Sequence, residues 1–180
     1  NLNLNLRSMS FAFGHLFGAW TLGKAYVYFA KKKISHYGWF FLLLGGILPD
    51  IDLVLDWVFR IDLHRTFTHS ILFLFTIPLL TYLLFSILRH EEKRSFAVLL
   101  GAGISMHLFL DSFFGYGVPL LWPKLIYFSI FSGIASHSSE GSFLLGTVDT
   151  LHNTLKLTIL DMAIGTAWIF YLWFRKRIQF

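Results

Sequence analysis

The residues of this chain that could carry chemistry are histidines and aspartates at spacings that suit a metal ion. His107 and Asp111 are four residues apart, so a helix would turn both side chains to one face. Asp50 and Asp52 follow Pro49, which ends a helix and leaves the backbone free to aim carboxylates at a cation. The chain has no cysteine, and a nitrogen and oxygen donor set suits Zn²⁺, Mn²⁺ or Fe²⁺ better than Mg²⁺ or Ca²⁺.

Three further histidines could join this set if the chain brings them close. His64 and His69 are five residues apart, which is the wrong spacing for one helix face. They converge only if a turn separates them, with His69 at the start of a helix and Thr68 as its N-cap. His15 lies in a Gly-His-Leu-Phe-Gly segment, whose glycines let another helix or a substrate approach closely.

The composition indicates that these residues belong to a membrane protein. Hydrophobic residues make up 56% of the 180-residue chain and charged residues 14%, against about 25% charged residues in an average soluble domain. The mean hydropathy is +0.63. The low charge argues against disorder, and the lack of cysteine argues against a disulfide-stapled module.

Apolar segments long enough to cross a bilayer must position the histidines and aspartates. A hydrocarbon core about 30 Å thick takes about 20 helical residues. Four stretches meet this length, at residues 11–30, 69–88, 96–114 and 157–174. Residues 37–48 form a fifth, shorter segment, and residues 125–135 are too short to span and are predicted to be interfacial or re-entrant. We therefore predict an all-α integral membrane protein with about five transmembrane helices plus an interfacial or re-entrant segment.

The chain reads as one domain. Residues 1–8 alternate asparagine and leucine before the first methionine, Met9, and are interpreted as an artificial leader. Residues 9–180 then form a single transmembrane helical domain, with residues 115–156 as an outer-face interfacial region.

If the five segments cross the membrane in alternating directions, the basic and acidic residues fall mostly on opposite sides of it. Nine of the fifteen basic residues fall on one side, in the loops 31–36 and 89–95 and the tail 175–180. This places that side, with the C-terminus, in the cytoplasm of an inner-membrane protein. Short basic clusters beside apolar runs do not form a groove-lining stripe, so we expect no nucleic-acid partner. Eight of the ten acidic residues fall on or near the other side: Asp50, Asp52, Asp56, Asp62, Asp111, Glu140, Asp149 and Asp161.

Five of the candidate ligands are predicted to share one depth. At about 1.5 Å of rise per residue they lie roughly 17–29 Å from the basic side, in the outer half of the bilayer. These five residues are His15, Asp50, His69, His107 and Asp111. Ionisable groups at membrane depth are costly and mark function, and a divalent cation would relieve the repulsion between the carboxylates. The pattern therefore predicts a metal site on the outer-facing side.

The same residues carry a resemblance to a known family. The chain resembles the YdjM-like membrane-bound metal-dependent hydrolases, the LexA-regulated inner-membrane family, through motifs that run in order from residue 14 to residue 123. These motifs are Gly14-His15, Leu48-Pro49-Asp50-Ile51-Asp52, His64-Arg65-Thr66-Phe67-Thr68-His69-Ser70, His107-Leu108-Phe109-Leu110-Asp111 and Gly117-Val118-Pro119-Leu120-Leu121-Trp122-Pro123. The chain departs from the family pattern at Leu53, where the family often has His, at Thr66, and at Phe113-Phe114.

The resemblance implies a metal site and a reaction. It assigns the metal positions to His15, Asp50, Asp52, His64, His69, His107 and Asp111. It also implies a distant kinship with zinc-dependent phospholipase C, and hence phosphoester chemistry.

These inferences together predict a membrane-embedded hydrolase that uses a metal-activated water on a phosphoester of a phospholipid or lipid-linked substrate. The donors suffice for two cations, with Zn²⁺ favoured and Mn²⁺ or Fe²⁺ as alternatives. Arg65 and Asp52 are the catalytic candidates, with Arg65 clamping a phosphate or else snorkelling to the headgroups. Trp122 is predicted to anchor the outer interface and line a substrate groove.

Other functions fit parts of the pattern. A metal transporter or a metal-binding structural protein would use the same ligands, but a transporter needs polar residues that continue through the membrane. A metal-dependent amide hydrolase shares the chemistry, although no His-Glu-x-x-His motif occurs. The roles of Asp149, His152 and Asp161, the oligomeric state and a lid function for residues 115–156 stay open.

Overall fold

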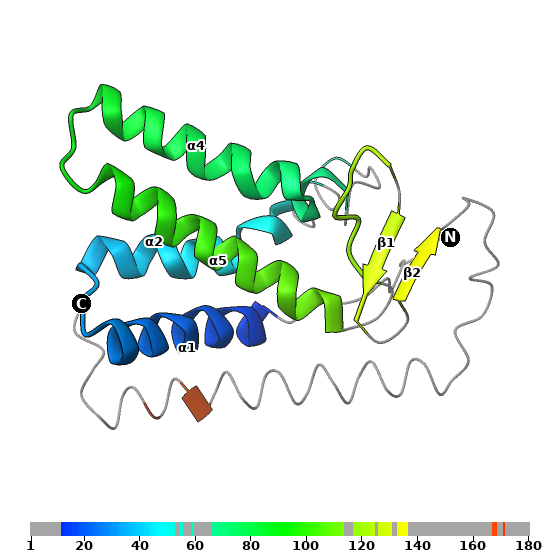
Figure 1. Ribbon diagram of the computed structural model, residues 1–180, viewed down its shortest axis with the longest axis horizontal. Coiled ribbons are helices and arrows are strands. Elements are labelled where there is room, and N and C mark those ends of the chain that lie inside the picture. The colour runs from blue at the N-terminus through cyan, green and yellow to red at the C-terminus, as the bar shows by residue number, and fades with distance from the viewer. Residues whose placement is uncertain are drawn as a thin grey trace.

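The computed structural model describes the part of the chain that holds most of the candidate site (Figure 1). The described residues are 12–52, 55, 59, 66–113, 117–124, 126–130, 133–136, 167–168 and 171. The predictions made for residues 1–8, for His64 and Arg65, and for Asp149, His152 and Asp161 lie outside these residues.

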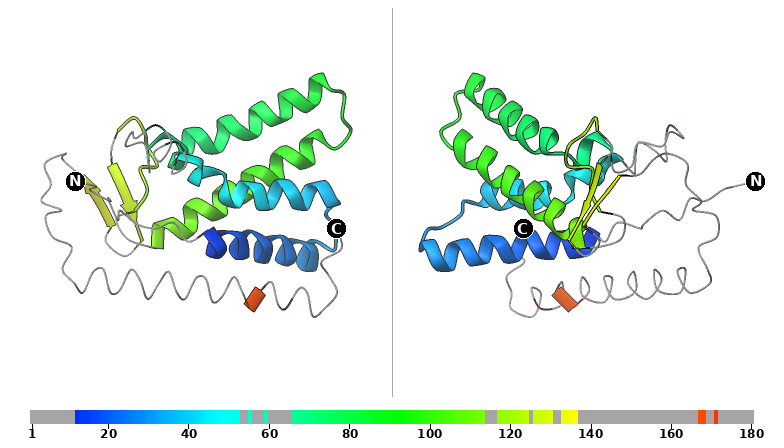
Figure 2. Two further views of the ribbon diagram at one scale, coloured as in Figure 1. Left: turned by 180° about the vertical axis from the view of Figure 1, so that it is seen from behind. Right: turned by 45° about the vertical axis from the view of Figure 1, so that its right-hand side comes forward.

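Four α-helices run alternately up and down and form most of the described structure (Figures 1 and 2). They are α1 (Ala12–Ala30), α2 (His36–Ile47), α4 (Ile71–Ile87) and α5 (Lys93–Phe113), labelled as in Figure 1. Helix α5 packs against each of the other three. The described chain is therefore mostly helical, as predicted, and the ends of these four helices lie within a few residues of the predicted limits. The predicted segment 157–174 lies almost entirely outside the described residues.

Glycines set the distance between α2 and α5. A Cβ atom added to Gly45 would lie 2.3 Å from the backbone oxygen of Leu100, and one added to Gly103 would lie 2.2 Å from the backbone oxygen of Leu42. Both separations are far shorter than a carbon–oxygen contact, so the two backbones touch where these glycines meet. This contact holds one face of α5 against the C-terminal half of α2.

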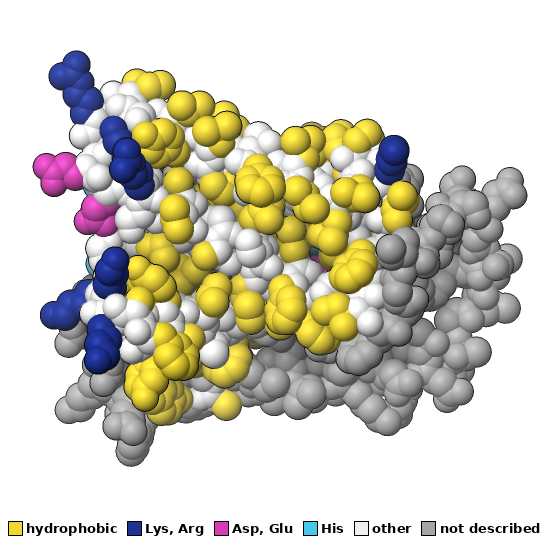
Figure 3. All heavy atoms as spheres, viewed as in Figure 1, with side chains coloured by type: hydrophobic (Ala, Val, Ile, Leu, Met, Phe, Trp, Pro, Cys, Tyr) yellow, Lys and Arg dark blue, Asp and Glu magenta, His cyan; other side chains and the backbone are white. Residues whose placement is uncertain are grey.

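The hydrophobic core lies where α4 and α2 pack against α5. Phe73 of α4 joins Leu100, Ile104 and Leu108 of α5 in one buried cluster. Many large apolar side chains point outward instead, and Figure 3 shows them covering the middle of the molecule. Such an apolar exterior is what a hydrocarbon surrounding requires.

The predicted number of five membrane spans is not supported by the described helices. Helix α5 is long and apolar enough to cross a membrane, while α4 is apolar but has only 17 residues. Helix α2 has 12 residues, and α1 carries Lys24, His15 and three glycines, which lower its hydropathy. Helix α4 runs through Pro78 without ending there.

The expectation of an all-α fold is wrong at residues 126–136. There β1 (Ile126–Ser129) and β2 (Gly133–Ser136) pair antiparallel, so these residues form strands; the interfacial or re-entrant placement of residues 125–135 stays a prediction. The backbone of Val118 adds hydrogen bonds to Phe128 on the other edge of β1. Gly117, at φ 81°, permits this approach because a Cβ there would lie 2.2 Å from the Phe128 oxygen. Strand pairing thus satisfies backbone hydrogen-bonding groups on both edges of β1.

The start of α4 also differs from the prediction. Ser70, and not Thr68, is the N-cap, and its hydroxyl accepts a hydrogen bond from the Phe73 backbone nitrogen. Residues Phe67–His69 form a 3₁₀ turn, η2, ahead of the helix. This turn frees the Thr68 side chain for another partner, described below.

We predict that Gly103→Ala lowers the free energy of unfolding by about 1–3 kcal/mol, because the new methyl group overlaps the α2 backbone. The matched control is Gly101→Ala, whose methyl group meets only the flexible ring of Pro78, at 3.2 Å. Thermal unfolding of the purified chain in detergent measures both. Equal midpoints for the two variants would contradict the backbone contact.

Candidate metal centre

The five side chains predicted to share one depth meet at the end of the helices opposite the loops 31–35 and 88–92. His15 comes from α1, and Asp50 ends a short 3₁₀ turn, η1 (Leu48–Asp50), that follows α2. His69 ends η2, and His107 and Asp111 lie one turn apart on α5. His69 and His107 are fully buried, and His15 and Asp111 are 3% and 4% exposed. Residues up to 96 positions apart in sequence thus build one buried site.

The donor atoms of four of these residues face one another at nearly equal distances. His69 Nε2 lies 3.3 Å from His107 Nε2 and 3.3 Å from Asp111 Oδ2. His107 Nε2 lies 3.6 Å from Asp111 Oδ2 and, like His69 Nε2, 3.6 Å from Asp50 Oδ1. Two donors on one tetrahedral Zn²⁺, each about 2.0–2.2 Å from the metal, lie about 3.3–3.6 Å apart. These separations are therefore those of ligands around a single cation.

A backbone carbonyl fixes which nitrogen of His107 faces the site. His107 Nδ1 lies 2.8 Å from the Gly46 carbonyl oxygen. A carbonyl oxygen only accepts, so Nδ1 donates its proton and the neutral ring presents the Nε2 lone pair to His69 and the carboxylates. A metal-ligating histidine needs this tautomer.

Asp52 fixes which nitrogen of His69 faces the site. Asp52 Oδ2 lies 3.2 Å from His69 Nδ1 and accepts a hydrogen bond of 2.5 Å from the Thr68 hydroxyl. The carboxylate thus accepts a hydrogen bond from Nδ1–H, and His69 Nε2 faces His107. Asp52 contacts the nitrogen of His69 that points away from the other donors, and its roles as metal ligand and catalytic residue stay predictions.

Asp111 links His15 to this cluster. Its Oδ1 lies 3.2 Å from His15 Nε2, while its Oδ2 faces His69 and His107. The His15 ring stacks on the His107 ring with centroids 3.9 Å apart. The described donors therefore fall into two overlapping groups, one of His15, His107 and Asp111 and one of Asp50, His69 and His107.

The arrangement fits a divalent cation. With both histidines neutral, the Nε2 lone pairs of His69 and His107 would meet the carboxylate oxygens in a buried space and repel them, and a bound cation would relieve that repulsion. His15 Nδ1 is also buried and makes no hydrogen bond within the described chain. The chemistry of this donor set suits Zn²⁺, Mn²⁺ or Fe²⁺.

Two residues outside the cluster hold its framework. Trp122, predicted to line a substrate groove, packs its ring on Phe67 of η2, with centroids 5.3 Å apart. The Ile71 backbone nitrogen at the start of α4 donates to the Leu120 oxygen, at 3.0 Å. The segment 117–124 therefore braces the turn that carries His69.

Sequence reasoning missed the partners of the two histidine Nδ1 atoms. The Gly46 carbonyl is a backbone group, which no residue type marks. Thr68 was interpreted as a helix cap, and only the fold of η2 reveals that its hydroxyl binds Asp52.

The described fold and site define a mostly helical protein with an apolar exterior and a buried cluster of side chains that could hold a metal ion. The chain belongs to the YdjM inner membrane protein family, whose sequence model matches residues 9–178. This family assignment places the protein in the inner membrane. Neither the curated proteins nor the solved structures contain a match to the chain.

We predict that the purified chain binds a divalent cation and that His69→Ala abolishes stoichiometric binding, because the substitution removes a central donor. His36→Ala is the matched control, since His36 is exposed at the start of α2. Elemental analysis after dialysis measures bound metal. Equal metal content in the two variants would contradict the site.

Asp52→Asn tests the positioning of His69. We expect about 10–100-fold weaker metal affinity, with the metal still bound, because an amide no longer holds the His69 tautomer as a carboxylate does. Competition with a fluorescent chelator measures the affinity. A complete loss of binding, as for His69→Ala, would instead make Asp52 a ligand.

Proposed function

We propose that this protein is a metal-dependent hydrolase that cleaves a phosphoester of a phospholipid or lipid-linked substrate. The observation that carries the proposal is the buried convergence of His69, His107, Asp50 and Asp111 at ligand-like separations of 3.3–3.6 Å. A divalent cation bound there would supply a water of lowered pKa and would neutralise charge on phosphoryl oxygens.

The carboxylate of Asp111 supports a two-ion site. Its two oxygens face different groups, with Oδ2 toward His69 and His107 and Oδ1 toward His15. His107 offers one lone pair, since its other nitrogen donates to the Gly46 carbonyl. Asp50, His69 and His107 would therefore hold one ion and His15 the other, and the two oxygens of Asp111 would serve both. Zn²⁺ is the favoured metal, with Mn²⁺ and Fe²⁺ as alternatives.

A lipid substrate follows from where the site lies. The family belongs to the inner membrane, and the site sits at the helix ends opposite the basic loops 31–35 and 88–92. Figure 3 shows basic side chains gathered at the loop end of the molecule. Under the positive-inside rule this end and the C-terminus are cytoplasmic, so the site faces the outer side. Arg65 remains the proposed phosphate clamp, and Trp122 a proposed substrate contact.

A metal transporter is the second candidate, and the surroundings of Lys24 weigh against it. Lys24 lies in α1 between the site and the basic end, with its Nζ 5.5 Å from the Trp20 ring and 5.4 Å from the Trp39 ring. Aromatic faces beside an ammonium stabilise it in place. They offer no ligand for a divalent cation that moves toward the other side.

We expect the metal-loaded protein to hydrolyse phospholipid in mixed micelles and to lose the activity with chelator. His69→Ala and Asp111→Ala should each lower turnover by more than about 100-fold, the upper range for residues that only support a ligand. His36→Ala should keep full turnover, since His36 lies at the opposite end of α2. Turnover that is equal in all variants, with and without chelator, would overturn the proposal.

A further inference from the structure

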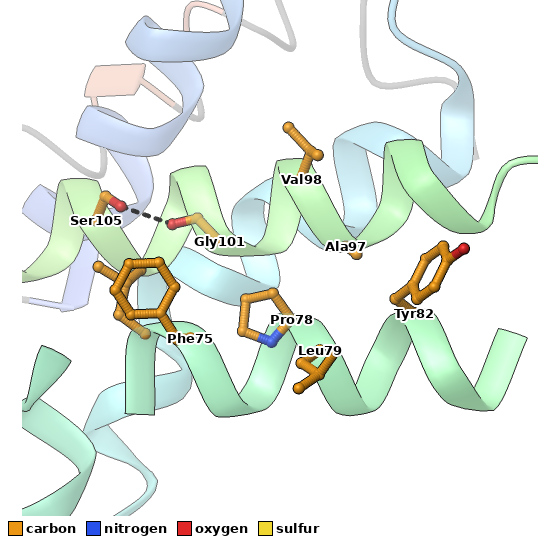
Figure 4. Close-up of a pocket in the computed structure, with 9 residues that line it drawn as sticks. Phe75, Pro78, Leu79, Tyr82, Ala97, Val98, Gly101 and Ser105 are labelled. Carbon is orange, nitrogen blue, oxygen red and sulfur yellow. Dashed lines mark hydrogen bonds between the residues drawn. The ribbon is translucent and has the colours of Figure 1, made fainter. Parts of the chain in front are cut away.

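An apolar groove runs between α4 and α5, away from the candidate metal centre (Figure 4). It has a volume of about 430 Å³ and is lined by residues within 74–82 of α4 and 97–105 of α5. The eight steps from residue 74 to residue 82 correspond to a rise of about 12 Å along α4. A groove of this shape accommodates an extended chain that lies parallel to the helices.

The groove exists because small side chains face Pro78. Gly101 and Ala97 lie opposite it on α5, and a Cβ added to Gly101 would already be 3.2 Å from the Pro78 ring. The Ser105 hydroxyl is not offered to an occupant, because it donates to the Gly101 carbonyl at 2.9 Å. The described walls of the groove therefore present apolar surface to an occupant, which favours a hydrocarbon chain.

The groove is separate from the metal centre. The buried cluster of Phe73, Leu100, Ile104 and Leu108 lies behind it, and Leu74 packs against that cluster. His107 points to the other side of α5, where its ring meets α2 at Gly46. The occupant of the groove therefore does not need to be the substrate of the hydrolase, and the inference that follows does not depend on the proposed activity.

One end of the groove is polar and basic. Tyr82 lines this end with its phenol ring (Figure 4). Arg94 precedes Ala97 and Val98 by three and four residues, so it lies on the groove face of α5. The neighbouring Glu92 is engaged by the Ser35 hydroxyl.

We propose that this groove binds one acyl chain of an anionic phospholipid from the leaflet on the basic side, with the lipid phosphate at Arg94 and Tyr82. An apolar trough that ends in a guanidinium and a phenol matches the chemistry of such a lipid, which is a hydrocarbon chain that ends in a phosphodiester. A second protein helix in the groove would not need the Arg94 guanidinium at its end. The membrane that surrounds an inner-membrane protein supplies the lipid.

Photocrosslinking from the acyl chain tests the proposal. The full chain is reconstituted into phosphatidylcholine vesicles that contain phosphatidylglycerol with a diazirine in its acyl chain, and labelled peptides are identified by mass spectrometry. We expect label on residues 74–82 and 97–105 above that on the other exposed helix faces. Leu79→Trp should reduce this label severalfold, because the indole fills the groove from its rim. Leu83→Trp is the matched control, since Leu83 is an exposed leucine one turn away that does not line the groove.

The headgroup contact has its own measurement. Arg94→Gln should lower the preference for phosphatidylglycerol over an equally labelled phosphatidylcholine by about fivefold, and Lys32→Gln, on the other basic loop, should leave the preference nearly unchanged. Both leucines and Arg94 are exposed, so the variants retain the core, which thermal unfolding checks.

Uniform labelling of all exposed faces would overturn the proposal. So would labelling that is unchanged in Leu79→Trp, equal labelling by the two lipids, or crosslinks that join copies of the protein at this groove instead of lipid.

Discussion

The contact between the backbones of α2 and α5 is the constraint on which the rest of the structure depends. Gly45 and Gly103 let the two helices touch, and the next residue on α2, Gly46, then directs its carbonyl oxygen to His107 at 2.8 Å. A larger side chain at either contact would part the helices and remove the acceptor that sets the His107 tautomer. The packing of two apolar helices and the chemistry of the candidate ligand are therefore one feature of the fold.

His69 and His107 are each oriented by a different kind of group, which contacts the Nδ1 nitrogen of the ring. A backbone carbonyl orients His107, whereas the Asp52 carboxylate, itself bound by Thr68, orients His69. The carbonyl adds no net charge, while the carboxylate raises the basicity of the ring it orients. The two nitrogens that meet at 3.3 Å are thus supported unequally, and His69 is the stronger electron donor of the pair.

The sequence predicts the ligands better than it predicts their supports. The spacing of His107 and Asp111 and the break at Pro49 depend on local geometry, so the segments and their shared depth could be inferred. The Gly46 carbonyl has no mark in the sequence, and the hydroxyl of Thr68 suits a helix cap as well as it suits Asp52. The strands at 126–129 and 133–136 were missed because each is only four residues long, too short for a pattern of alternating residues to stand out. Five spans are not supported among the described residues, because α2 and α4 are shorter than the 18 residues that a span needs.

The free-energy cost of burying these charged side chains favours a binding role for the cluster. Only 14% of the chain is charged, yet Asp50, Asp52 and Asp111 gather beside fully buried His69 and His107. Burying one charged group costs several kcal/mol. Burying several of them therefore costs about as much free energy as an entire domain gains from folding. Apolar side chains would join these helices more stably, as they do a few residues away in the core of Phe73, Leu100 and Ile104. A cation that binds the folded chain would return the lost stability through its own binding free energy, which supports the proposal that this cluster holds a metal.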